Sequence, residues 1–241
     1  MSVLYNDLSR VYDIIFPENP FATAFLLKDL RPNSRILDIA CGTGTYTMAL
    51  ARIGHTVWGL DLDGEMIAAA QRKAAGYDVS FITGNMLDID VVFSNQVFDL
   101  IFCIGNSLVH LGDRESVAKL VEKAFGLLGR NGIFIVQIVN YDRIIRDRIE
   151  SLPIIERAEH GVTFIRNYKF TGDPEHVNFN TEILCGDSSI TNSVRLLALR
   201  SGDLADSIRS AGFSDVCLYG GYDESRHDEN SMATVVRGRR R

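Results

Sequence analysis

The sequence lacks several features that would point to a particular class of function. Its four cysteines stand far apart and form no Cys-x-x-Cys pair, so neither a zinc site nor a disulfide framework is indicated. We expect these thiols to be reduced, as in a cytoplasm. The chain has no run of about 18 apolar residues and no signal-peptide pattern, which argues against a membrane protein. A net charge of −6 argues against a nonspecific grip on nucleic acid.

Arginine clusters at one place only, the C-terminal stretch Arg237-Gly238-Arg239-Arg240-Arg241. This stretch is too short to form a nucleic-acid footprint, and we expect it to be a solvated end. The rest of the composition is that of an ordinary globular protein, with 46% hydrophobic and 23% charged residues among 241. That length suffices for one large domain or for a domain with an insert. We expect a single domain over residues 1–241.

The chain is organised around residues 35–46. The apolar run at 36–39 predicts a short buried strand. Beyond Gly44 the apolar spacing changes to that of one helix face, carried by Tyr46, Ala49, Leu50 and Ile53. Gly42 and Gly44 therefore lie where a strand turns sharply into a helix. Such a junction presents free N–H groups and the positive end of a helix dipole to a ligand.

Strands and helices alternate along the following hundred residues. After the first strand, four more apolar runs predict strands at 56–60, 79–83, 98–104 and 133–139, with helical segments between them. This rhythm indicates a parallel sheet with helices on both faces. Two late runs, 216–219 and 232–236, are expected to complete it as a terminal hairpin. The predicted fold class is α/β, a doubly wound and mostly parallel seven-stranded sheet.

Polar side chains follow four of these strands. Asp61, Asn85, Asn106 and Asn140 each stand at the carboxyl end of a predicted strand, which is where open α/β sheets bind their ligands. A carboxylate at Asp61, beside the glycine turn, is a natural partner for two vicinal ribose hydroxyls. The alternative is a helix cap, and we assign the cap to Asp63.

Two segments lie outside this alternation. Residues 1–30 are predicted to form an N-terminal helical cap, broken at Pro17 and Pro20, and Tyr12 lies within it. Residues 151–200 alternate loosely and lack helical faces, which predicts an inserted antiparallel sheet. We expect this sheet to cover the active site. Its alternative role is an oligomer interface, and a homo-oligomer is left open.

A nicotinamide dinucleotide is the first alternative ligand for the glycine turn. Its fingerprint, Gly-x-Gly-x-x-Gly, requires a third glycine, and this chain has Thr47 at that position. Asp38 lies in the approach to the turn, where a carboxylate would repel a pyrophosphate. The same carboxylate suits a ligand with an ammonium or sulfonium cation.

The stretch Leu37-Asp38-Ile39-Ala40-Cys41-Gly42-Thr43-Gly44 closely resembles the first motif of class I S-adenosylmethionine-dependent methyltransferases. The resemblance extends over nearly the whole chain. Two further stretches, 103–111 and 140–144, are similar to signatures of the glycine N-methyltransferase group. The first motif is specific for the superfamily, and the other two are moderately specific for small-molecule N-methyltransferases.

This resemblance implies a cofactor, S-adenosylmethionine, and roles for the matched positions. The carboxylate of Asp61 would bind the ribose hydroxyls. The remaining cofactor-binding positions would be, for the methionine part, Asp38, Ala40 and Gly42, with Tyr12 over its carboxylate; for the adenine, Leu62, Met66, Asn85 and Met86; for the methionine side and the reaction centre, Ile104 and Asn106; and, in the same motif, Cys41 and Gly44.

The acceptor is expected to be a small molecule, and its identity is not written in the sequence. The glycine enzymes carry an arginine immediately before the Asn-Tyr-Asp signature to hold the substrate carboxylate, and this chain has Val139 there. Glycine is therefore not the expected substrate. The candidate substrate-binding residues are Asn140, Tyr141, Arg166 and Arg195. His110 and Tyr141 are the candidate proton acceptors, against the alternative that both simply pack.

Rival functions from other classes are left open. A small-molecule O-methyltransferase fits the same motifs. Nucleic-acid methyltransferases are disfavoured, because Gly105-Asn106-Ser107 replaces the Pro-Pro-aromatic run of amino-methylating DNA enzymes and no cysteine follows a proline. The two other rival functions are a non-catalytic cofactor-binding regulator and a nicotinamide reductase. We favour N-methylation by in-line displacement.

Overall fold

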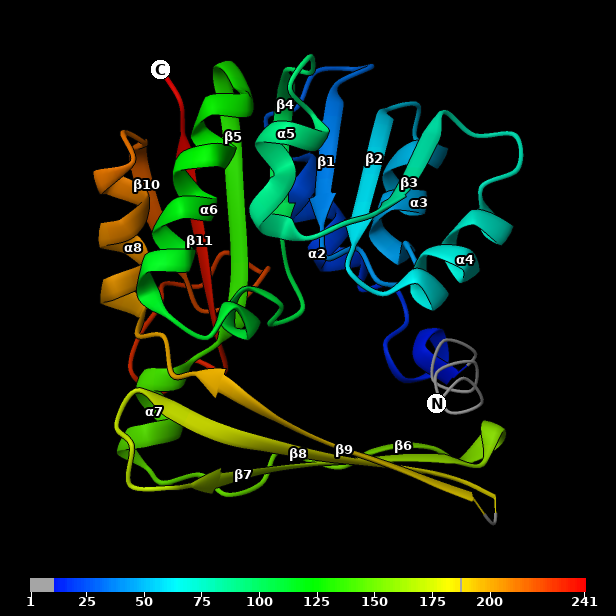
Figure 1. Cartoon of the computed structure of the whole chain (residues 1–241), viewed down its shortest axis with the longest axis vertical. Coiled ribbons are helices and arrows are strands. Elements are labelled where there is room, and N and C mark those ends of the chain that lie inside the picture. The colour runs from blue at the N-terminus through cyan, green and yellow to red at the C-terminus, as the bar shows by residue number, and fades with distance from the viewer. Residues whose placement is uncertain (1–10, 187) are drawn as a thin grey trace.

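A computed structural model describes residues 11–186 and 188–241, and its main body is a seven-stranded sheet (Figure 1). The strand order is β10-β11-β5-β4-β1-β2-β3. Strands β1 to β5 pair in parallel, and β11 runs antiparallel between β5 and β10. The predicted fold and terminal hairpin are confirmed. The strands are β1 (Arg35–Ile39), β2 (Thr56–Asp61), β3 (Val79–Thr83), β4 (Phe98–Cys103), β5 (Leu128–Val139), β10 (Ser214–Tyr219) and β11 (Ala233–Arg239).

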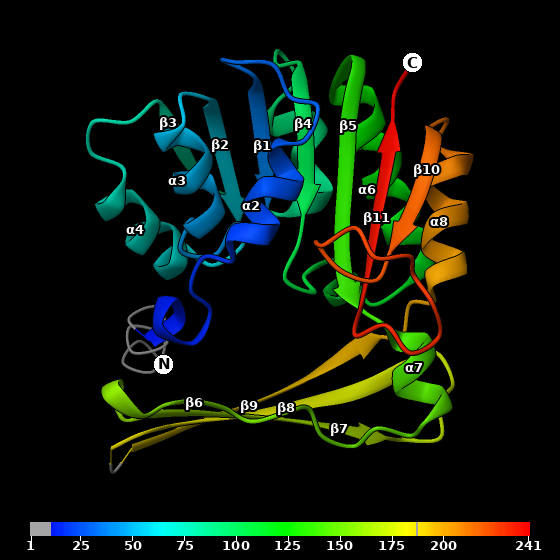
Figure 2. The ribbon, with the colours of Figure 1, turned by 180° about the vertical axis from the view of Figure 1, so that it is seen from behind.

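Helices cover both faces of this sheet, as Figures 1 and 2 show from opposite sides. One face carries α2 (Pro20–Leu27), α3 (Thr45–Arg52) and α4 (Gly64–Lys73), and the other α5 (Ile89–Val92), α6 (Arg114–Leu127) and α8 (Ser201–Ser210). Residues 11–15 are also helical. The short elements are α7 (Tyr141–Arg146), η1 (Met86–Asp88), η2 (Leu108–Leu111) and η3 (Ala158–His160). Within the described chain, no helix is long and apolar enough to span a membrane.

A second, four-stranded antiparallel sheet lies below the carboxyl ends of the main strands (Figure 2). Its strands are β6 (Ile155–Arg157), β7 (Val162–Phe170), β8 (His176–Cys185) and β9 (Ser188–Leu197). At one end Tyr168 joins the apolar core that contains Tyr141. At the other end Phe164 packs with Ile15 of the N-terminal segment. The small sheet therefore packs on the main body at one end and on the N-terminal segment at the other.

Two helix ends show how the chain passes between elements. Strand β5 follows α6 without a loop: Leu128, the C-cap of α6, already has the extended φ of −79° and ψ of 142°, and Gly129 and Gly132 both lie in β5. The N-cap of α8 is Arg200, whose side chain makes no capping hydrogen bond. The cap is supplied from elsewhere in the chain, since Asp142 Oδ2 accepts a hydrogen bond from Ser201 N–H at 2.8 Å.

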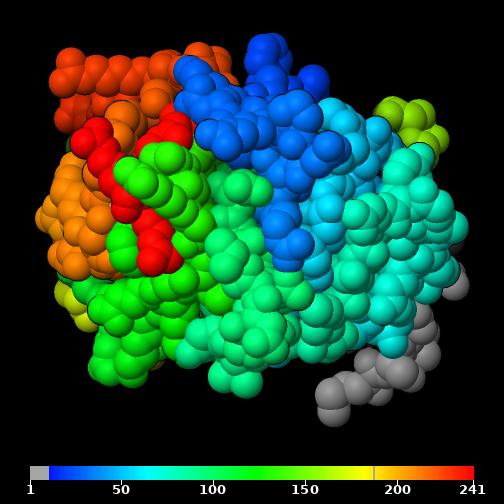
Figure 3. Space-filling model, turned by 90° about the horizontal axis from the view of Figure 1, so that it is seen from above, coloured from blue at the N-terminus to red at the C-terminus, as the bar shows by residue number. Residues whose placement is uncertain are grey.

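The arginine-rich tail is not a free solvated end. It runs over the top of the molecule between the green and orange segments (Figure 3). Arg240 donates to the carbonyls of Phe125 at 2.7 Å and Gly126 at 3.1 Å, and it stacks over the Phe125 ring. Arg237 pairs with Asp29 at 2.7 Å. Arg240 thus satisfies carbonyl groups at the C-terminus of α6, where a cation is favourable.

Candidate active site and the family it identifies

The glycine turn connects β1 to α3 in a left-handed backbone. Ala40, Gly42 and Gly44 have φ values of 59°, 56° and 75°. Gly44 cannot carry a side chain, because a Cβ there would come within 2.5 Å of the Phe81 ring. At Gly42 a Cβ would face the Tyr12 ring at 3.5 Å. The turn therefore presents bare backbone below an aromatic ring.

Two carboxyl groups flank this turn. Asp38 is 3% exposed at the end of β1 and accepts a hydrogen bond from Thr47 Oγ1 at 2.6 Å. Burial raises the pKa of Asp38 to about 8, and the charge of Asp61 adds to the shift. Asp61 accepts from Gly42 N–H at 2.7 Å and from Asp63 N–H at 2.9 Å, while desolvation raises its pKa. The pair favours a cationic ligand, because a cation would stabilise both ionised forms.

The N-terminal segment is fastened over the turn by Asp13. Its carboxylate accepts hydrogen bonds from the hydroxyls of Thr43 and Thr45 and forms an ion pair with Lys73 of α4 at 2.7 Å. These contacts hold Tyr12 against Gly42. Burial and the neighbouring carboxylates raise the pKa of Tyr12 to about 12, so its hydroxyl is protonated at neutral pH.

Two cavities meet at the carboxyl ends of β1 and β4. The first encloses about 420 Å³ and is lined by Ala40, Leu60, Asp61, Leu62, Gly84, Asn85, Met86, Leu87, Ser107, His110 and Leu111. The second encloses about 550 Å³, and its wall combines the end of β1, the N-terminal segment, β6 and Tyr222. Ala40 and Ser107 belong to both walls. The arrangement suits an elongated ligand that crosses from one cavity to the other beside the glycine turn.

Comparisons with known proteins agree with this geometry. Residues 36–132 match the family model described as "Methyltransferase domain". The glycine/sarcosine N-methyltransferase of Aphanothece halophytica is 28% identical over 219 residues, which cover 86% of this chain and 77% of that protein. Together these findings support a class I S-adenosylmethionine-dependent methyltransferase.

Solved methyltransferases share the fold over almost their whole length. The CcbJ methyltransferase of Streptomyces caelestis aligns with a TM-score of 0.83 at 22% identity, covering 98% of both chains. A S-adenosylmethionine-dependent methyltransferase of Clostridium acetobutylicum aligns with a TM-score of 0.82 at 18% identity, again covering 98% of both. The small second sheet thus falls within the aligned length.

The cavities of this methyltransferase contain most of the predicted cofactor positions. Asp61, Leu62, Asn85 and Met86 line the first cavity, and Tyr12, Asp38, Cys41 and Ile104 line the second. Ala40 lines both, and Gly42 lies below Tyr12. Met66 is 8% exposed on the buried side of α4 and lines neither cavity.

Asn106 is turned away from both cavities. Its φ of 68° places it in a left-handed turn after β4. The side-chain oxygen accepts from Val139 N–H at 3.0 Å, and the amide nitrogen donates to the Tyr141 hydroxyl at 3.1 Å. The flanking residues Gly105 and Ser107 line the second cavity instead. Asn106 therefore shapes the loop between the cavities without facing into either.

The two candidate proton acceptors lie apart from each other. His110 lines the first cavity with Asp61 and Asn85, and desolvation lowers its pKa while the charge of Asp61 opposes that shift. Tyr141 is completely buried, packs against Tyr168 with ring centroids 6.3 Å apart, and lines neither cavity. The arrangement does not bring either side chain into the second cavity.

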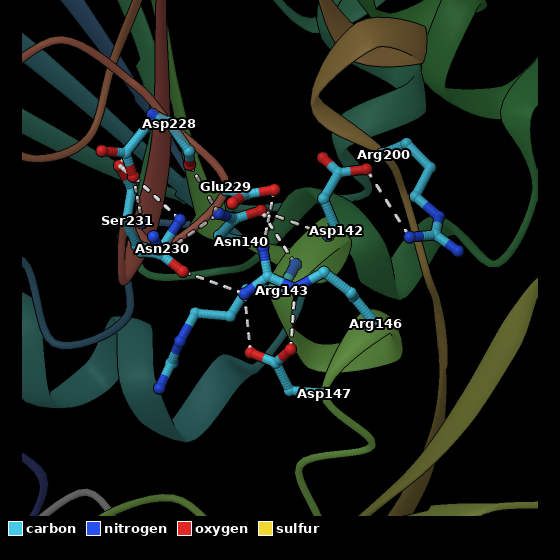
Figure 4. A network of polar contacts seen from close by, with 10 residues as sticks. All are labelled: Asn140, Asp142, Arg143, Arg146, Asp147, Arg200, Asp228, Glu229, Asn230 and Ser231. Carbon is cyan, nitrogen blue, oxygen red and sulfur yellow. Dashed lines mark hydrogen bonds and ion pairs between the residues drawn. The ribbon is translucent and has the colours of Figure 1, made fainter.

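The three other candidate substrate residues have structural partners. Asn140 is 1% exposed: its oxygen caps α7 through Asp142 and Arg143, and its amide donates to the carbonyls of Asp228 and Ser231 (Figure 4). Arg166 donates to the Pro153 carbonyl at 2.7 Å. Arg195 pairs with Asp173 on the small sheet. None of the three lines either of the two cavities.

Several residues of the second cavity were missed in the sequence. They are Glu18, Tyr46, Gln137, Arg157 and Tyr222. They come from five separate segments and share no motif. Only Gln137 carried a local signal, a polar residue inside the apolar run of β5. The others meet because the N-terminal segment, β6 and the loop after β10 fold over the same strand ends.

Proposed function

We propose that this methyltransferase transfers a methyl group from S-adenosylmethionine to the nitrogen of a small-molecule acceptor. The observation that carries the proposal is the pair of cavities that meet at Ala40 and Ser107. The first cavity would hold the ribose and adenine of the cofactor. The second would hold its methionine part and leave room beside the turn for the acceptor. The similarity to the Aphanothece glycine/sarcosine N-methyltransferase supports nitrogen as the target. A small-molecule O-methyltransferase is the alternative.

The residues at the turn fit the cofactor. In the first cavity Asp61 would accept from the ribose hydroxyls, and Leu62, Asn85 and Met86 would surround the adenine. In the second cavity Asp38 and Ala40 would receive the methionine part, with Cys41 beside them and the bare backbone of Gly42 under Tyr12. The backbone of Gly44 would open α3 toward the same group. Asp38 and Asp61 suit a cationic cofactor for the electrostatic reason given above.

When bound, S-adenosylmethionine supplies a methyl group on a sulfonium sulfur, which needs no further activation. The chain contributes position: holding an acceptor in line with the methyl can account for roughly 7–11 kcal/mol of the barrier. A neutral amine forms the N–C bond while the C–S bond breaks with its electron pair moving to sulfur. The new ammonium then loses a proton to water. This route assigns no general base to the chain, which agrees with the placement of His110 and Tyr141 outside the second cavity.

A substitution at His110 tests whether the chain supplies a general base. We expect His110→Ala to raise the KM for S-adenosylmethionine by about 5- to 20-fold, the effect of one lost hydrogen bond or packing interaction. The pH profile of kcat between pH 6 and 9 should keep its shape, because the imidazole lines the cofactor side. Steady-state kinetics across that range decides the question. Loss of one limb of the kcat profile, with KM unchanged, would restore His110 as a general base.

The proposed function is tested by binding and turnover together. Calorimetry should detect S-adenosylhomocysteine binding and no binding of NADPH. A screen of small amines, amino acids and hydroxylated metabolites should release S-adenosylhomocysteine with at least one amine. Tight NADPH binding without S-adenosylhomocysteine binding would favour a reductase. Cofactor binding with no acceptor turned over anywhere in the screen would favour a regulator, and turnover of hydroxyl acceptors alone would favour O-methylation.

A further inference from the structure

The second cavity holds one carboxylate that the cofactor would leave unpaired and one basic side chain. That carboxylate is Glu18, since Asp38 would face the cofactor ammonium, and among the described residues of the wall Arg157 alone is basic. Glu18 precedes α2 and is exposed, and its Oε1 accepts from Thr23 Oγ1 at 2.8 Å, which orients the carboxylate at the wall. A carboxylate held in this way offers a partner to an ammonium or amine group.

The guanidinium of Arg157 is occupied by the main chain. Its Nε donates to the Ile14 carbonyl at 3.0 Å and its Nη2 to the Ile15 carbonyl at 3.2 Å. Its Nη1 donates to the Glu156 carbonyl at 3.3 Å. Three of its five N–H groups therefore have main-chain acceptors, in a set of hydrogen bonds that joins β6 to the N-terminal segment. The Nε–Nη2 edge, which could otherwise clamp a carboxylate in bidentate fashion, is taken by the Ile14 and Ile15 carbonyls. Val139 at the end of β5 supplies no cation either.

Gln137 adds a neutral donor to the same wall. Its Oε1 accepts from Gly105 N–H at 2.8 Å, and the Tyr222 hydroxyl lies 3.4 Å away. A main-chain N–H can only donate, so the amide oxygen must face Gly105. The amide Nε2 therefore points away from that bond with two N–H donors. Such donors can bind an uncharged hydroxyl or ether oxygen of an acceptor molecule.

We propose that the acceptor is a hydroxylated amine without an acidic group, whose nitrogen is recognised by Glu18 and whose oxygen is recognised by Gln137. This inference rests on the proposed function and names the substrate class for the same site. It follows from a cavity whose wall combines the Glu18 carboxylate, the Arg157 guanidinium hydrogen-bonded to the main chain, and the neutral amide donor of Gln137. An amino acid would place its carboxylate near the Glu18 carboxylate with no clamp to hold it.

Matched acceptor pairs test the proposal directly. Ethanolamine and glycine, serinol and serine, and glucosamine and glucosaminic acid each differ by an acid group. With S-adenosylhomocysteine release as readout, we expect kcat/KM for the hydroxylated amine to exceed that for its acid partner by at least about tenfold, the effect of one repulsive interaction between carboxylates. Equal or greater turnover of the acids overturns the proposal.

Glu18→Gln isolates the carboxylate. We expect this variant to lower kcat/KM for the amines by about 10- to 100-fold and to reduce the preference within each pair below about threefold. Its affinity for S-adenosylhomocysteine should stay within about twofold, because Glu18 is not among the residues proposed to bind the cofactor. Glu115→Gln is the matched control, an exposed glutamate at the start of α6 that pairs with Lys119. An unchanged amine preference in Glu18→Gln also overturns the proposal.

The binding measurement separates this inference from the proposed function. Absence of S-adenosylhomocysteine binding would contradict the function itself. Binding of S-adenosylhomocysteine with turnover of acids, or with no hydroxylated amine either bound or methylated, would leave a methyltransferase and overturn only the substrate class.

Discussion

Asp61→Asn should weaken binding of S-adenosylhomocysteine by about 30- to 1000-fold. The variant keeps the shape of the side chain, removes its charge and replaces one accepting oxygen by an NH2 group. One hydrogen bond from the ribose then becomes a weaker neutral one, and the other loses its acceptor. The expected loss is about 2–4 kcal/mol, within the range for hydrogen bonds to charged groups. Isothermal calorimetry at fixed pH and salt measures it.

Asp63→Asn is the control for this effect. Asp63 stands two residues further along and caps α4 by accepting from the N–H groups of Glu65 and Met66. Asparagine caps a helix as well as aspartate does, so the fold and the affinity should both be retained. Urea denaturation of the two variants checks their stability. Equal loss of affinity at both positions, or no loss at Asp61, would contradict the ribose assignment.

The sequence predicts the cofactor side of this methyltransferase well because that side is local. The change from an apolar run to a helical face, with glycines between, occurs within residues 35–53. Parallel pairing then places the end of β2 beside the turn, and Gly42 N–H indeed donates to Asp61. Both facts follow from periodicity and from the geometry of a βαβ unit.

The direction of side chains after β4 and β5 could not be predicted in this way. Asn106 and Asn140 stand at strand ends, as the sequence indicates. The left-handed backbone at Asn106 aims its amide toward Val139 and Tyr141, and Asn140 turns inward to cap α7. A polar residue at a strand end can bind a ligand or satisfy the backbone, and the sequence pattern is the same for both.

The acceptor side of the site is still harder to predict from the sequence, because it is assembled from distant segments of the chain. Glu18, Arg157 and Tyr222 come from three widely separated parts of the chain. They meet only after the N-terminal segment packs on the small sheet and the loop after β10 folds over β5. No period or motif encodes that meeting. Arg166 and Arg195 of the small sheet were candidates by charge alone, but Arg166 donates to the Pro153 carbonyl, Arg195 pairs with Asp173, and neither lines the two cavities.

Binding of S-adenosylhomocysteine should also depend strongly on pH through Asp38. In the free protein burial raises the pKa of Asp38 to about 8, so the carboxyl group is mostly protonated at pH 7. An ammonium group bound beside it would favour the ionised form and lower that pKa. Below pH 8 binding must then release a proton, and affinity should fall by up to about tenfold for each unit that the pH decreases. Above pH 8 this group contributes no further dependence.

Asp38→Asn isolates this linkage from the titration of the ligand, whose own α-amino group loses its proton near pH 8. Both proteins should lose affinity on the alkaline side, because the ammonium disappears there. Only the native protein should lose it on the acid side, and only the native protein should release a proton at pH 7, measured by calorimetry in two buffers of different ionisation enthalpy. An acid limb of equal slope in both proteins would show that Asp38 does not face the ammonium, because that proton would then come from another group.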